Sequence, residues 1–273
     1  MAGVAPLGLV SISLDRVSVA FRSAVEAVHE VSLEVARGEF VAVVGPSGCG
    51  KSTLLNAIAG LLDPATAEVT GRILIDGVGQ RERSRRDANL GYVFQRDALL
   101  PWQTLLDNTQ LGLAIRGVPR ERRLARANEL MAMAGLAGFE HYYPHQVSGG
   151  MRQRASLLRT LAYDPQTILM DEPFGALDAQ NRMVLQAELL RIWQQTPRTI
   201  LFVTHDLAEA IVLAQRVVVM SRRPGQLKAV HAIDLPYPRD AFALRGSADF
   251  ARLETTIWQM LRDEFRASAG ATA

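Results

Sequence analysis

The chain has 273 residues, of which 48% are hydrophobic and 21% charged, and its formal net charge is +2 at pH 7. This length and composition allow a sizeable core, as one large domain or two small ones, and exclude wholesale disorder. The small net charge gives no support for nucleic-acid binding. A single cysteine, Cys49, excludes an internal disulfide framework and fits a reducing compartment.

Neither a membrane span nor a signal peptide is expected. The most apolar long stretch, residues 199–220, is interrupted by Asp206, Glu209 and Arg216. No run therefore reaches the roughly 18–20 apolar residues that a membrane-spanning helix needs. Residues 1–10 are apolar but lack a basic segment and a convincing cleavage site. We expect a soluble, cytosolic chain that reaches a membrane only through a partner.

The N-terminal part of the chain is predicted to form β-strands. Residues 10–21 and 31–35 alternate apolar and polar side chains, which is typical of half-buried strands. Residues 38–45 form a short apolar run rich in valine, which indicates a central parallel strand buried on both faces. A helix over 51–62, strands over 73–76 and 90–94, and a solvated arginine-rich loop over 81–87 are expected to follow.

The pattern turns helical from about residue 97 to 163, with apolar residues at helical spacing. Two more apolar strands, 167–173 and 199–205, are separated by a helix around 181–195. This order predicts an α/β fold with a parallel sheet and an inserted helical subdomain. After residue 224 we expect short β segments, a proline-rich turn and a final amphipathic helix over about 248–266.

Residues 45–52, GPSGCGKS, match the phosphate-binding P-loop pattern G-x-x-x-x-G-K-[ST] between a predicted strand and a predicted helix. The glycines let backbone N–H groups wrap a phosphate, Lys51 supplies a charge for the β- and γ-phosphates, and Ser52 offers a hydroxyl to Mg²⁺. Lys51 and Lys228 are the only lysines of the chain, which argues against a chance match. The predicted nucleotide-binding residues here are Gly45, Pro46, Ser47, Gly48, Cys49, Gly50, Lys51, Ser52 and Thr53.

An acidic pair ends the strand at 167–173. At the C-terminal edge of a parallel sheet, Asp171 and Glu172 would face a ligand crevice. Asp171 is expected to hold Mg²⁺ through water, and Glu172 to activate the attacking water as general base. The alternative is a strand-end pair that only caps a helix.

Two further polar side chains stand at strand ends. His205 ends the strand at 199–205, which we expect to lie beside the P-loop strand, so that His205 reaches the γ-phosphate. Gln95 follows the strand at 90–94 and can contact metal or water. Neither residue is convincing alone, but together with Lys51 and the acidic pair they predict a catalytic site. The predicted catalytic residues are Glu172, His205, Gln95 and Lys51. The predicted metal-binding residues are Ser52, Gln95 and Asp171.

A second anion cradle is predicted well after the P-loop. Ser148, Gly149 and Gly150 lead directly into a helical stretch, where backbone N–H groups and the helix dipole favour an anion. One compact chain therefore carries two such cradles.

In this order, GPSGCGKST, the Gln95 loop, VSGG, ILMDEP, GALD and THD resemble the ATP-binding subunit of an ABC transporter, from about residue 10 to 222. The resemblance implies a P-loop NTPase core with a parallel sheet, an N-terminal antiparallel β subdomain and an inserted helical subdomain over about 97–163. It places the ATP-binding domain at 10–224 and a C-terminal extension at 225–273.

The resemblance also explains the two cradles. In this family two ATP-binding subunits pair head to tail, and the SGG segment of one covers the γ-phosphate of the ATP held by the other. It implies ATP and Mg²⁺ as cofactors, a second and identical subunit, and a coupling role for Asp178 across the interface. Phe21 matches the aromatic position that stacks on adenine, unless it is a core strand residue. One departure is Met151, which stands where the family usually has glutamine, and its effect is open.

Because no membrane span is expected, the permease would be a separate protein, as in bacterial importers. Leu99, Leu100, Pro101 and Trp102 are candidates for docking it; alternatively, Trp102 packs within the helical subdomain. The resemblance is to the nitrate/sulfonate/taurine importer branch, which takes solute from a periplasmic binding protein and works at the cytoplasmic face of the bacterial inner membrane. The rival reading, a soluble ABC ATPase acting on nucleic acid or ribosomes, is disfavoured because the chain lacks a second ATPase domain and its charge is nearly balanced.

Overall fold

The computed structural model describes residues 10–80, 82, 89–175 and 177–269. The chain divides into two compact units, residues 1–87 with 197–273 (the P-loop unit) and residues 88–196 (the helical unit). The signal-peptide question and nearly all of the expected arginine-rich loop fall outside the described residues. The helical unit covers a longer range of residues than the subdomain expected over about 97–163, because the strands β6 (Leu90–Val93) and β7 (Thr167–Asp171) and the helix α5 (Ala179–Gln195) also belong to it.

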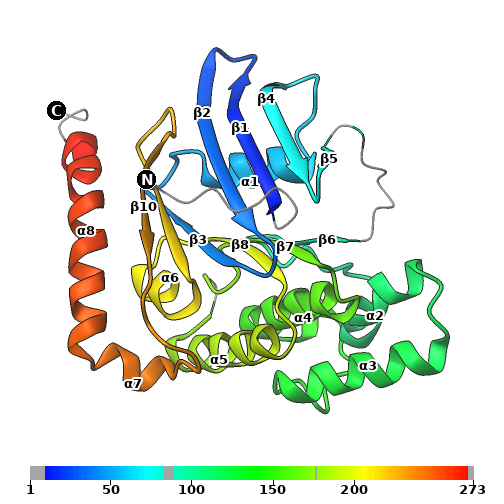
Figure 1. The fold of residues 1–273 in the computed structure, drawn as a ribbon. Helices are drawn as coiled ribbons and strands as arrows, with labels where there is room; N and C mark the ends of the chain where they lie inside the picture. The colour runs from blue at the N-terminus through cyan, green and yellow to red at the C-terminus, as the bar shows by residue number, and fades with distance from the viewer. Residues whose placement is uncertain (1–9, 81, 83–88, 176, 270–273) are drawn as a thin grey trace. The chain divides into compact units, whose positions relative to one another are not determined.

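An antiparallel sheet opens the P-loop unit, with strand order β2-β1-β4-β5 (Figure 1). Leu14 of the central strand β1 faces Leu33 on one side and Ile73 on the other. Alternating burial along β1 explains the alternation in the sequence. The strands are β1 Val10–Phe21, β2 Val25–Ala36, β4 Ala67–Ile75 and β5 Val78–Gly79.

The P-loop strand β3 (Phe40–Val44) is central in this unit and buried along its whole length. It pairs in parallel with β8 (Thr199–Val203) on one side and β9 (Arg216–Met220) on the other, as expected for β8. β10 (Leu227–Ala232) extends the sheet antiparallel to β9. The helices of the unit are α1 Lys51–Ala59, α6 Leu207–Leu213, α7 Ala241–Arg245 and α8 Ala248–Ala269.

The helical unit contains one parallel strand pair, in which Val93 of β6 faces Met170 of β7. Its helices α2, α3 and α4 pack on one another through apolar residues such as Leu105, Leu130 and Leu158. The elements are β6 Leu90–Val93, α2 Leu105–Ile115, α3 Arg120–Met133, the short η2 Pro144–Gln146, α4 Gly149–Ala162, β7 Thr167–Asp171 and α5 Ala179–Gln195.

The predicted α/β class, with parallel strands, an N-terminal antiparallel sheet and inserted helices, is confirmed. The stretch considered as a membrane span is instead the succession β8, α6 and β9. Across the part of the chain that the structure describes, every helix is too short or too polar to cross a bilayer.

Candidate active site

The P-loop joins β3 to α1, and its shape depends on glycine. Gly48 has φ +75° and Gly50 has φ +107°, conformations that other residues rarely adopt. A Cβ on Gly50 would also lie 2.4 Å from the carbonyl oxygen of Ala27. Ser47 and Gly48 are exposed, so the outer part of the loop faces solvent.

The Lys51 ammonium group is held inside this loop. Its Nζ donates to the carbonyl oxygens of Gly45 at 2.8 Å and Pro46 at 3.0 Å, and the residue is buried. Burial raises the pKa of the neighbouring Cys49 thiol, although the charge of Lys51 opposes this shift. Cys49 is therefore neutral at pH 7, and the lysine is the charge that the loop offers to an anion.

His205 follows β8 at the edge of the sheet where β3 enters the P-loop. The amide of Thr204 donates to the carbonyl oxygen of Val43 at 3.2 Å, which fixes this end of β8 next to β3. The Thr204 hydroxyl donates to Glu209 at 2.6 Å, and Asp206 caps α6, so a local hydrogen-bond network shapes the turn around the exposed His205. Sequence reasoning missed Thr204 and Glu209.

Gln95 and Glu172 meet in the helical unit. They follow neighbouring parallel strands, and Gln95 Nε2 donates to Glu172 Oε2 at 3.1 Å. Asp171, the last residue of β7, is buried, while Glu172 is half-buried with φ +46°. Since the next helix, α5, has Asp178 as its N-cap, neither carboxylate of the pair fills that position.

Tyr92 is a neighbour of this pair that sequence reasoning missed. Burial raises the pKa of its phenol, and the negative charge of Asp171 raises it further. The phenol is thus neutral near a buried carboxylate. Nothing in the local sequence indicates that Tyr92 lies near Asp171, because their proximity depends on the pairing of β6 with β7.

The SGG segment starts helix α4. Ser148 is its exposed N-cap, and the Ser148 hydroxyl oxygen accepts from the amide of Met151 at 3.3 Å. Any residue except proline can donate this backbone bond, so methionine in place of glutamine preserves it. Arg152 stabilises the turn before α4 by donating a hydrogen bond to the carbonyl oxygen of Val147 at 3.0 Å.

Asp178 and Phe21 lie in different units. Asp178 caps α5, and hydrogen bonds from the backbone and side chain of Asn181 lower the pKa of its carboxyl group. Phe21 ends β1 opposite Val25 and Ala67 and is only half-buried, so it is not a fully enclosed core residue.

The proposed docking residues divide by burial. Leu99 is buried, whereas Trp102 is 71% exposed, so the Trp102 ring does not pack inside the helical unit. Asn108, which sequence reasoning missed, holds this loop. Its amide nitrogen donates to the carbonyl oxygens of Leu100, Gln103 and Thr104 at 3.1, 3.2 and 3.0 Å.

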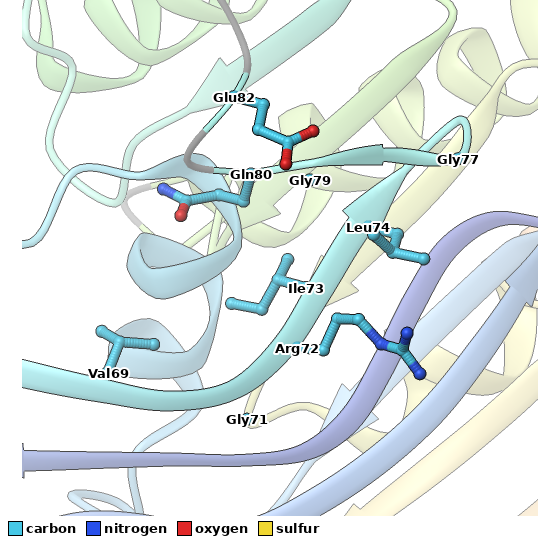
Figure 2. A pocket seen from close by; sticks show the side chains of 9 residues that line it. All are labelled: Val69, Gly71, Arg72, Ile73, Leu74, Gly77, Gly79, Gln80 and Glu82. Carbon is cyan, nitrogen blue, oxygen red and sulfur yellow. The ribbon is translucent and has the colours of Figure 1, made fainter.

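A pocket of about 280 Å³ lies in the P-loop unit and is unrelated to these residues. Figure 2 shows it beside β4 and β5, with Val69, Ile73, Leu74 and Gln80 among its lining residues. None of the predicted site residues lines it.

Within the described ranges, no group of three or more His, Cys, Asp or Glu residues is placed to hold a metal ion. The ligand set predicted for Mg²⁺ uses one hydroxyl, one amide and one carboxylate, and these hard oxygen donors suit that ion without such a cluster.

Comparisons with known proteins identify the family of the chain. The family described as ABC transporter matches residues 28–175. A taurine import ATP-binding protein of Rhizobium johnstonii is 42% identical over 270 residues, covering 94% of this chain and all of that protein. An uncharacterized ABC transporter ATP-binding protein of Methanocaldococcus jannaschii is 48% identical over 240 residues, covering 88% of this chain and 86% of the relative.

Solved structures of ABC-type ATP-binding cassettes also match the chain. A dimeric ATP-binding cassette in a post-hydrolysis state, bound to ADP and Pi, has a TM-score of 0.72 and 31% identity, covering 82% of this chain and all of that one. A dimeric bacterial ABC transporter cassette has a TM-score of 0.73 with the same identity and coverage.

The fold, the P-loop motif and these matches together define an ABC ATPase cassette. The chain belongs to the ABC transporter family, and it is an ATP-hydrolysing, ATP-binding subunit of that family. The reported relatives give no support to the nucleic-acid or ribosome alternative.

Proposed function

We propose that this chain is the ATPase subunit that energises import of a small solute, such as nitrate, a sulfonate or taurine, through a separate membrane permease. The similarity to taurine import ATP-binding proteins over nearly the full chain supports this class of solute. No residue named above would contact the solute, so the solute itself must be found through the permease or its periplasmic binding protein.

The substrate of hydrolysis is taken to be ATP with Mg²⁺. In this proposal, backbone N–H groups of residues 45–53 and the Lys51 ammonium group bind the phosphates. Ser52 and Gln95 would supply oxygen ligands to the ion and Asp171 would hold it through water, and the ion would neutralise charge on the phosphates. His205 binds the γ-phosphate, and Phe21 stacks on adenine.

Glu172 is assigned as the general base, and the observation that carries this assignment is its contact with Gln95. The amide of Gln95 donates to one carboxylate oxygen, Oε2, at 3.1 Å and thereby orients the group. A carboxylate accepts through both oxygens, so the other can take a proton from an attacking water. The strained backbone of Glu172, at φ +46°, is consistent with a functional position.

The second anion cradle is proposed to act on the ATP of a partner subunit. Ser148, Gly149 and Gly150 would cover that γ-phosphate in a head-to-tail pair of identical chains, and Asp178 would couple the two sites. Both structural neighbours are dimeric, which supports such a pair.

The segment of Leu99, Leu100, Pro101 and Trp102 is proposed to dock the permease through its exposed residue Trp102, since Leu99 is buried. Trp102 is 71% exposed, and tryptophan is enriched at protein interfaces relative to the rest of the surface. In this arrangement the chain works at the cytoplasmic face of the bacterial inner membrane, with a periplasmic solute-binding protein on the other side.

Mass spectrometry of proteins that copurify with the chain from gently solubilised native membranes tests this function. We expect a multi-span permease, and we expect Trp102→Ala to lose it while the variant still hydrolyses ATP. Recovery with ribosomes or DNA and without a permease would overturn the proposal. A permease retained at parental level by Trp102→Ala would overturn the docking site alone.

A further inference from the structure

The turn between β9 and β10, residues 221–226, lies directly against the P-loop. Gly225 makes this approach possible, because a Cβ there would lie 2.2 Å from the carbonyl oxygen of Cys49. The backbone of Gly225 is also bonded to β2 on both sides: its amide donates to Ala27 at 3.0 Å, and its carbonyl oxygen accepts from His29 at 3.0 Å. The turn is thus fixed between β2 and the P-loop.

From this turn Arg223 reaches the P-loop backbone. Its Nε and Nη2 both donate to the carbonyl oxygen of Gly48, at 3.2 and 3.1 Å. Charge-assisted bonds of this kind are stronger than those between neutral groups. Because the peptide plane between Gly48 and Cys49 moves as one unit, holding this oxygen also sets the direction of the Cys49 amide.

Glu264, on the terminal helix α8, holds the same turn from the other side. One carboxylate oxygen accepts from the backbone amide of Arg222 at 2.9 Å, and the other accepts from Lys228 Nζ at 2.9 Å. The two partners flank Arg223 in the sequence. The amide of Arg222 and the ammonium group of Lys228 lower the pKa of Glu264, so its carboxylate is charged at neutral pH.

We propose that Arg223 is a positioning residue for the nucleotide site, and that Glu264 holds the 221–226 turn so that Arg223 keeps the P-loop in its phosphate-binding conformation. The C-terminal extension thereby acts on ATP affinity. A glycine-rich loop loses much conformational freedom when it is ordered by a ligand, and contacts that order it beforehand reduce this cost. The inference rests on the proposed phosphate-binding role of the P-loop.

The test is the affinity for ATP with Mg²⁺, measured by calorimetry on the full chain, together with kcat and KM for hydrolysis. Loss of one or two hydrogen bonds in Arg223→Ala should weaken binding about three- to tenfold and raise KM, with kcat changed much less. Arg223→Lys, which can still donate to Gly48, should recover part of the affinity.

Glu264→Ala should weaken ATP binding about two- to fourfold, because it acts only through the turn. Glu264→Gln, which still accepts from the Arg222 amide but loses the charge facing Lys228, should fall between Glu264→Ala and the parent. Glu254→Ala removes an exposed carboxylate from the same helix and serves as the matched control with parental affinity. In the double variant Arg223→Ala/Glu264→Ala, binding should be no weaker than in Arg223→Ala alone.

Parental affinity in Glu264→Ala would overturn the inference, and so would a double variant whose loss is the product of the two single losses. Such results would mean that Arg223 acts without the terminal helix. Lys51→Ala, measured in parallel, tests the P-loop assignment separately. If Lys51→Ala binds ATP normally, the proposed function fails whatever the Glu264 variants show.

Discussion

Glu172 is the residue whose chemistry can be tested most directly. Replacing its carboxylate by an amide in Glu172→Gln keeps the size of the side chain but removes the proton acceptor. We expect ATP hydrolysis to fall roughly 10²–10⁴-fold, the usual contribution of a general base, while ATP binding is retained. Phosphate release at saturating ATP and calorimetric binding measure the two quantities.

The control for this variant is Glu129→Gln, which neutralises an exposed carboxylate of α3. It should hydrolyse ATP at the parental rate. A Glu172→Gln turnover within about threefold of the parent would contradict the general-base role, because a proton acceptor in the transition state contributes far more than that.

For single residues, the sequence predicted which polar side chains stand at strand ends but not which groups they contact. Gln95 and Glu172 are far apart in the chain, and their hydrogen bond depends on the parallel pairing of β6 and β7. Asn108 and Arg223 were missed for a related reason. Their partners are groups of the backbone and not of side chains, so no side-chain pattern marks them.

Among the elements, the loop before α2 depends on one buried side chain. Asn108 has no exposed surface, and besides its three donated bonds its Oδ1 accepts from the amide of Leu100 at 2.8 Å. Asn108→Ala would remove four hydrogen bonds to the part-buried backbone of this loop and leave a cavity at a fully buried position. We expect a loss of about 2–4 kcal/mol in the free energy of unfolding. Urea denaturation followed by circular dichroism measures it.

Trp102→Ala changes the same loop without touching this network, since the ring is 71% exposed. Its free energy of unfolding should stay within about 0.5 kcal/mol of the parent. If Asn108→Ala were as stable as Trp102→Ala, the loop would have to be held by other contacts, and Asn108 would lose its assigned role.

The predicted elements were most accurate where burial alternates or is bounded by turns, as in β1 and β3. β8 was predicted as the strand over 199–205, whereas α6 and β9 were not predicted. Nearly every residue of the succession β8, α6 and β9 is buried, which removes the periodicity that separates helix from strand. Even Glu209 of α6 is buried, with its carboxylate satisfied by the Thr204 hydroxyl at 2.6 Å. A charge inside an apolar run was therefore a sign of a local network and not of an exposed face.

For the whole molecule, the two anion cradles belong to different units. The P-loop lies in the unit formed by residues 1–87 and 197–273, and Ser148 with its two glycines lies in the unit formed by residues 88–196. If each ATP is shared between two subunits, as proposed, ATP binding should promote dimerisation of the chain. The measurable consequence is a change of mass in solution.

In the Glu172→Gln background, where ATP persists, we expect addition of ATP with Mg²⁺ to double the mass seen by light scattering after gel filtration. Adding Ser148→Arg places a long side chain at the exposed start of α4 and should abolish this doubling, while circular dichroism shows an unchanged fold. Ser148→Thr, which keeps a hydroxyl at the N-cap, is the matched control and should still dimerise. A Ser148→Arg variant that dimerises as readily as its parent would mean that the SGG segment does not cover the partner's ATP, and the second cradle would need another ligand.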